Sequence, residues 1–166
     1  FAMNAQSETW AEKLGLGTLR ESDEPLVNDL LDLLGATEVD MTLFFRHLCS
    51  INEPDVAHVA DAFYEGSEPD TSAWNRWLKR WWERVDGQPD RDGMRRANPK
   101  YVLRNWMAQL AIDAAEERDD FSVAEELHEL LKRPYDEQPE HEAKWFQKRP
   151  EWARHRVGCS MLSCSS

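Results

Sequence analysis

The sequence has few cysteines, no long apolar run and no excess of basic residues. Three cysteines in 166 residues are an odd, sparse number, which excludes the disulfide framework of a small secreted domain and favours a reducing compartment. No apolar run approaches the roughly 20 residues of a membrane span. The first residues, FAMNAQSETW, have neither the basic start nor the apolar segment of a signal peptide. We therefore expect no membrane contact.

Basic residues are outnumbered by acidic ones. The 20 lysines and arginines against 32 aspartates and glutamates give a net charge of −12. A nucleic-acid-binding protein normally presents a basic face, because contacts to phosphates dominate its affinity. The basic clusters here, RDGMRR and RHR, are short and lie among acids. We expect no nucleic-acid partner.

Strand signals are nearly absent, whereas helical signals run along the whole chain. Hydrophobic residues make up 41% of the sequence and charged residues 31%, which is typical of a globular protein. The sequence predicts an all-α fold, an irregular bundle of about eight helices over residues 1–156, followed by a flexible cysteine-containing tail at 157–166. Predicted helices begin near Ser7, Asp23, Asp40, Asp55, Thr71, Asn98, Ser122 and Glu140.

Several of these starts carry specific capping signals. Asn98 followed by Pro99 resembles a helix N-cap with proline in the first turn. Ser122 with Glu125 three residues later resembles a capping box. Gly35 is a plausible stop for the helix that Asp23 and Pro25 begin.

Apolar faces at helical spacing predict the core. We expect two faces to be buried: Leu26, Leu30 and Leu33, and Leu103, Trp106 and Leu110. A third stripe, Trp74, Trp77, Leu78, Trp81 and Val85, follows the spacing i, i+3, i+4, i+7 and i+11. Such a stripe is more often core than a ligand platform, and the alternative is a Trp-rich face that docks on a partner.

No motif establishes a catalytic or metal site. The GLG at 15–17 lacks the third glycine of a dinucleotide fingerprint and predicts a helix stop. DGQPDRDG at 86–93 resembles half a calcium loop but lacks carboxylates at its first and last ligand positions. His155, Cys159 and Cys164 supply only three of the four ligands that a structural zinc site needs. We expect no cofactor or metal in this segment.

Four stretches together resemble one family. They are NPKYVLRNWMAQLAIDAAE, LLKRPYDEQPE, RPEWA and the terminal CSS, and they resemble the selenoprotein O (SelO/YdiU) protein adenylyltransferases. The resemblance implies a kinase-like domain that uses ATP with Mg²⁺ or Mn²⁺ to transfer AMP to hydroxyl groups of other proteins. It implies that those ATP- and metal-binding residues lie upstream, and that this chain is the helical C-terminal region that packs on the kinase-like domain. The chain begins at Phe1 rather than Met, and we expect a fragment that is inactive alone.

The resemblance also singles out the terminal thiols. Many animal members carry selenocysteine at the third position from the end, and bacterial members commonly carry cysteine, here Cys164. It implies a redox role for Cys164, with Cys159 as a second, local partner; inert exposed thiols are the alternative. A bacterial member would be cytoplasmic.

Two other classes of function stay open. One is a free-standing helical interaction module with a Trp-rich docking face. The other is a small thiol redox protein using Cys159 and Cys164, which is weakened because these residues do not form a CxxC motif at a helix N-terminus. The expected partners are the chain's own kinase-like domain and the protein substrates of the complete enzyme.

Overall fold

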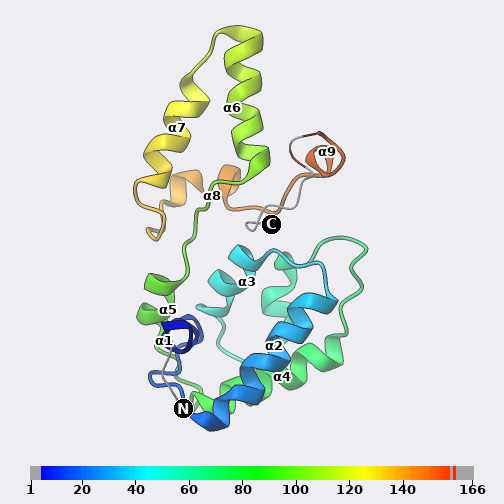
Figure 1. Ribbon diagram of the computed structural model, residues 1–166, viewed down its shortest axis with the longest axis vertical. Coiled ribbons are helices and arrows are strands. Elements are labelled where there is room, and N and C mark those ends of the chain that lie inside the picture. The colour runs from blue at the N-terminus through cyan, green and yellow to red at the C-terminus, as the bar shows by residue number, and fades with distance from the viewer. Residues whose placement is uncertain (1–4, 158, 160–166) are drawn as a thin grey trace. The chain divides into compact units, whose positions relative to one another are not determined.

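The computed structural model describes residues 5–157 and residue 159, with only the backbone for residues 5–8 (Figure 1). In this part of the chain the regular structure is helical, apart from an isolated bridge between Val39 and Phe63. The all-α prediction is therefore confirmed. The helices are α1 (Ala5–Lys13), η1 (Glu21–Asp23), α2 (Glu24–Ala36), α3 (Met41–Leu48), η2 (Val56–Ala62), α4 (Thr71–Arg84), α5 (Arg91–Ala97), α6 (Asn105–Arg118), α7 (Ser122–Leu131), α8 (Pro139–Trp145) and α9 (Glu151–Arg154).

The helices form two compact units. The first ends at Asn98 and contains α1 to α5, and the second begins at Pro99 and contains α6 to α9. Each unit buries an apolar cluster of its own, which is what allows a short helix to persist in water.

The face of α4 that was predicted to be apolar forms the centre of the first core. Its buried residues are Trp74, Trp77, Leu78, Trp81 and Val85. Trp77 and Trp81 stack with their ring planes 6° apart. Their indole N–H groups donate to the carbonyl oxygens of Leu26 and Leu14 at 2.8 and 2.9 Å. The Trp77 and Trp81 rings are thus buried with their polar groups satisfied, and the stripe is core rather than a docking face.

Aspartate side chains begin three helices of this unit. Asp40, Asp70 and Asp90 each accept a hydrogen bond from the backbone N–H three residues on, at 2.9–3.0 Å. Two of these starts were predicted. The third begins α5, which was not predicted as a helix.

The second unit begins with an extended segment. The backbone N–H groups of Lys100 and Tyr101 donate to Pro134 O at 2.8 and 3.0 Å. Helix α6 and helix α7 then form a hairpin, whose turn has Asp119 in the left-handed conformation at φ 52° (Figure 1). The core beneath the hairpin consists of Tyr101, Trp106, Met107, Leu127, Leu130, Trp145, Ala153 and Cys159.

The predicted helix start at Asn98 is wrong. Asn98 follows the end of α5, and its side-chain amide donates to Lys13 O and Met94 O at 3.0 and 2.9 Å. Helix α6 begins only at Asn105 because the preceding backbone is engaged by Pro134. Leu103 therefore lies outside the helix and is 50% exposed, contrary to the expected buried face.

Four smaller predictions also fail. Ser122 is the first residue of α7 rather than its cap, and its N–H donates to Asp120 Oδ1 at 2.9 Å. Gly35 lies inside α2, which continues to Ala36, and Leu33 is only half-buried. Ser7 lies within α1.

Candidate functional site

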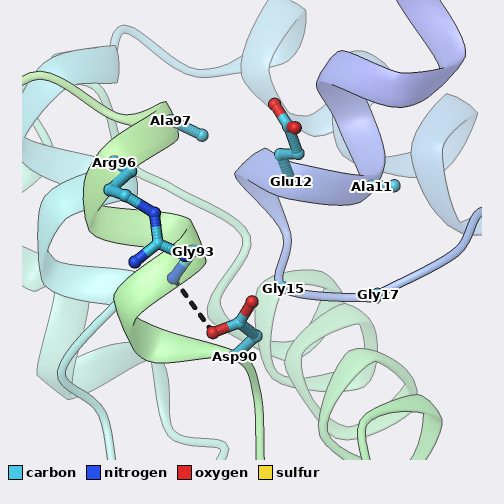
Figure 2. Close-up of a pocket in the computed structure, with 8 residues that line it drawn as sticks. All are labelled: Ala11, Glu12, Gly15, Gly17, Asp90, Gly93, Arg96 and Ala97. Carbon is cyan, nitrogen blue, oxygen red and sulfur yellow. Dashed lines mark hydrogen bonds between the residues drawn. The ribbon is translucent and has the colours of Figure 1, made fainter.

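A polar cavity of about 290 Å³ lies between the end of α1 and helix α5 (Figure 2). Its lining residues are Ala11, Glu12, Gly15, Gly17, Asp90, Gly93, Arg96 and Ala97. Figure 2 shows Glu12 on α1 and Arg96 on α5, with Asp90 at the start of α5. The cavity therefore brings both signs of charge together.

The wall of this cavity depends on Gly15. The residue has φ +63°, and a Cβ there would lie 2.8 Å from the Sδ atom of buried Met94. Asp90 accepts the N–H of Gly93 as its capping bond, so its carboxylate is already engaged. Glu12 and Arg96 have no side-chain hydrogen bond or ion pair with any residue that the structure describes. They could bind a polar group, and the lining includes no Ser, Thr, Cys, His or Lys side chain.

A second hollow of about 480 Å³ shares Gly15, Gly17 and Asp90 with the first and is also lined by Arg84, which forms an ion pair. The Arg84 guanidinium contacts both carboxylate oxygens of buried Asp23, at 2.6 and 2.9 Å. Burial alone would raise the pKa of Asp23, but the hydrogen bonds from Arg84 and from the Arg20 N–H outweigh it and lower that pKa. These two charges hold the fold and are not available for a ligand.

A third hollow of about 340 Å³ is an open groove between α2 and α4. It is lined by Asp29, Asp32, Leu33 and Ala36 from α2, and by Ala73, Arg76, Trp77 and Arg80 from α4. Sequence analysis did not find it. The signal available in the sequence was that the lining residues of both helices follow the spacing i, i+3, i+4 and i+7.

The Cys49 thiol is buried and forms no disulfide with any described residue. Its Sγ lies 3.1 Å from Phe45 O. Burial raises the pKa of this thiol above its ordinary value, against the opposing effect of the nearby Arg46 and Arg95 charges. Because the thiolate is the reactive form, Cys49 is a packing residue.

Of the two thiols predicted to have a redox role, one is described. Cys159 is 5% exposed in the core of the second unit, and within the described residues it forms no disulfide. Cys164 lies outside the described residues. The predicted pair is therefore not tested, and Cys159 lies in a core that its polar sequence neighbours did not suggest.

The motifs that resembled metal sites have structural roles in the described residues. Asp90 caps α5, and Asp92 pairs with Arg95 at 3.5 Å. Among the residues that the structure describes, no three His, Cys, Asp or Glu side chains gather closely enough to hold a metal ion. A search of the same residues finds no helix with the length and apolar character to cross a bilayer.

Comparison with known proteins identifies the protein family to which the chain is related. The cavities alone do not identify it. The family model described as "Protein adenylyltransferase SelO" matches residues 2–132. The protein nucleotidyltransferase YdiU of Flavobacterium johnsoniae is 46% identical, over 96% of this chain and 33% of that protein. The corresponding proteins of Azoarcus sp. and Rhodopirellula baltica are 46% and 47% identical, over 94% of this chain and 31% and 33% of their lengths.

An all-α chain with these matches is related to proteins named nucleotidyltransferases. More narrowly, the chain belongs to the SelO family of protein adenylyltransferases. It spans about a third of the length of these relatives. The resemblance found in the sequence is thereby confirmed at the level of the family.

Proposed function

We propose that this chain is the C-terminal helical part of a protein adenylyltransferase. In the complete protein, a Ser, Thr or Tyr hydroxyl of a protein substrate attacks the α-phosphorus of ATP. The new bond is O–P, the bond to the β-phosphate oxygen breaks, and pyrophosphate leaves. The observation that carries this proposal is the 46% identity to proteins named nucleotidyltransferases over nearly the whole chain.

The residues present do not fit a magnesium or manganese site, because the described part of the chain lacks the necessary cluster of ligands. No step of the reaction is therefore assigned to residues of this chain. We assign ATP and the metal ion to a kinase-like domain of the complete protein. The role of this chain is to pack on that domain, and its partners are that domain and the protein substrates, in the cytoplasm.

The test compares the chain with the complete protein. Each is incubated with Mg²⁺ and ATP labelled at the α-phosphate, in the presence of a mixture of acceptor proteins. The proposal predicts protein-bound label with the complete protein and none with this chain. Transfer by this chain alone would place the active site within it, and absence of transfer by the complete protein would overturn the activity.

The alternative of a Trp-rich docking module has no supporting observation. Trp74, Trp77 and Trp81 are between 0 and 2% exposed, so the stripe presents no face to a partner.

We also propose that Cys164 is a regulatory thiol of the complete enzyme. Cys159 is buried, and thiol–disulfide exchange requires an accessible thiolate. It is therefore a poor local disulfide partner for Cys164. The expected partner is a cysteine of the kinase-like domain. With oxidised complete enzyme, Cys164→Ser should abolish the response of AMP transfer to reductant. An unchanged response in the Ser variant would exclude Cys164 as the switch.

A further inference from the structure

The side-chain amine of Lys13, the last residue of α1, has only neutral groups as its contacts. Lys13 is half-buried, and its Nζ donates a hydrogen bond to Asn98 Oδ1 at 3.0 Å. The same nitrogen lies 4.6 Å from the centroid of the Phe45 ring. It forms no ion pair with a carboxylate of any residue that the structure describes. Lysines in proteins are mostly exposed, so this setting sets Lys13 apart.

The fold also fixes the orientation of this amine. Asn98 is 1% exposed, and its amide group donates to Lys13 O and Met94 O at 3.0 and 2.9 Å. Because both amide N–H groups of Asn98 are used in this way, its Oδ1 stays directed at the Lys13 amine. The Phe45 ring that faces the amine is 3% exposed and belongs to the core. A nucleophile that is already held in one orientation loses little freedom when it reacts.

The surroundings favour the neutral form of the amine. Burial lowers the pKa of the Lys13 ammonium below its ordinary value, and the electrostatic influence of Cys49 opposes this only in part. At neutral pH, a larger share of Lys13 than of a fully exposed lysine is therefore the neutral amine. The neutral amine is the form that attacks an electrophile, and desolvation is a common way to activate a lysine.

We propose that Lys13 is an acyl-acceptor site, modified by a compact activated acyl group of the acyl phosphate class. The Nζ lone pair attacks the acyl carbon, so that an N–C bond forms and the C–O bond to the phosphate breaks. Phosphate leaves with the bonding electrons, and the nitrogen gives up one proton to it. Half-burial of Lys13 restricts the approach, which favours a small acyl donor. This inference is independent of the proposed function.

The product fits the same surroundings. An N-acyl-lysine is neutral, so the modification removes a partly desolvated charge that no described carboxylate balances. The amide keeps one N–H, which can still donate to Asn98 Oδ1. The bonds from the Asn98 amide to Lys13 O and Met94 O do not involve Nζ, so they persist after acylation.

The test compares Lys13 with Lys79 in the complete protein. Lys79 lies on α4, is exposed, and has no hydrogen bond or ion pair with any described residue. The protein is incubated with acetyl phosphate between about pH 7 and about pH 10. Peptide mass spectrometry then gives the rate of acetylation at each lysine. The ratio of the two rates cancels the decay of the reagent, and the restricted access to Lys13 affects this ratio equally at every pH.

We expect the ratio of the Lys13 rate to the Lys79 rate to fall by about twofold or more across this range. The reason is that the neutral share of an exposed lysine keeps rising up to about pH 10, whereas a lysine of lower pKa approaches saturation. A ratio that stays constant over the range would overturn the proposal, and so would the absence of acetylation at Lys13.

One substitution tests the neutral surroundings directly. Asn98→Asp places a carboxylate beside Nζ, which favours the ammonium form and should lower the Lys13 rate relative to Lys79 by about fivefold or more at neutral pH. Asn28→Asp adds the same charge at an exposed position of α2 and should leave the ratio unchanged. Circular dichroism checks that each variant is folded. An unchanged ratio in folded Asn98→Asp would contradict the proposal, and the wild-type ratio decides it if that variant does not fold.

A second donor tests the size of the acylating group. Acetyl coenzyme A carries the same acetyl group on a bulky leaving group, so the rate at Lys13 relative to Lys79 should be lower with it than with acetyl phosphate. Equal ratios with the two donors would overturn the assignment to a compact acyl phosphate. None of these measurements uses AMP transfer, so their outcome and that of the proposed function are distinguishable.

Discussion

Trp106 and Trp152 belong to the same unit but have different surroundings. Trp106 is 3% exposed and stacks on Trp145 with ring centroids 5.9 Å apart, whereas Trp152 is 43% exposed. Trp106→Ala should therefore lower the free energy of unfolding by about 3–5 kcal/mol, because it leaves a cavity that neighbours cannot fill. Urea unfolding followed by circular dichroism measures this difference.

The matched control is Trp152→Ala, which should cost below about 1 kcal/mol. Similar losses in the two variants would contradict the assignment of Trp106 to the core.

The Asp23–Arg84 pair makes stability depend on pH in the acid range. The pKa of Asp23 is lower in the folded protein than in the unfolded chain, because hydrogen bonds from Arg84 and Arg20 outweigh burial. Its contribution is fully present above the unfolded pKa, roughly 3.9, and is lost as pH falls through the folded pKa. Asp23→Ala should cost about 3 kcal/mol at neutral pH, since Arg84 loses its partner.

Chemical unfolding at a series of pH values tests this pair. The gap in stability between the wild type and Asp23→Ala should shrink below pH of about 4. Asp29→Ala removes the exposed partner of Arg80 and serves as control, with a small effect at every pH. A constant gap for Asp23→Ala down to the lowest pH would contradict the linkage.

The surroundings of two residues, Asn98 and Cys159, could not be predicted from the sequence. Asn98 and Pro99 form a strong local signal for a helix start, but the Asn98 amide instead bonds Lys13 O and Met94 O. Those partners are tertiary or belong to the preceding helix, so the local pattern cannot distinguish them from a cap. Cys159 is a similar case, because nothing in VGCSMLSCSS indicates that it is buried.

At the scale of elements, the turn after α1 fixes how that helix meets α5. Gly15 and Gly17 both have positive φ, but only Gly15 is crowded, by Met94 and the backbone of Asp90; Gly17 has open space. Gly15→Ala should introduce both backbone strain and overpacking. It should therefore lower the free energy of unfolding by about 2–5 kcal/mol. Gly17→Ala should introduce backbone strain alone and lower the free energy of unfolding by about 1–2 kcal/mol.

Thermal unfolding of the two variants checks this order. Equal losses would show that the close approach of Gly15 to α5 does not contribute to stability.

Periodicity predicted the long amphipathic elements well. The α4 stripe was predicted residue by residue, because aromatic residues at i, i+3, i+4 and i+7 have few alternatives to a buried helical face. Helix α5 was missed because its seven residues carry one apolar side chain that is buried, Met94. The groove between α2 and α4 could not be predicted, since it depends on which two helices become neighbours.

At the scale of the whole molecule, the family and the expected reaction came from a resemblance spread over several stretches. Among the described residues, the charged groups near the hollows include a structural ion pair and a helix cap, and no cluster of metal ligands is found. We therefore predict that titration of ATP with Mg²⁺ into this chain gives no heat of binding in a calorimeter. Micromolar affinity would mean that this chain contains the ATP site.

The proposed function makes this chain part of an enzyme that adds AMP, and not phosphate, to proteins. The most direct measurement is the mass of an acceptor protein after incubation with the complete protein, ATP and Mg²⁺. The account predicts an increase equal to one or more AMP groups, located at Ser, Thr or Tyr by fragmentation. An increase equal to a phosphate group instead would contradict it.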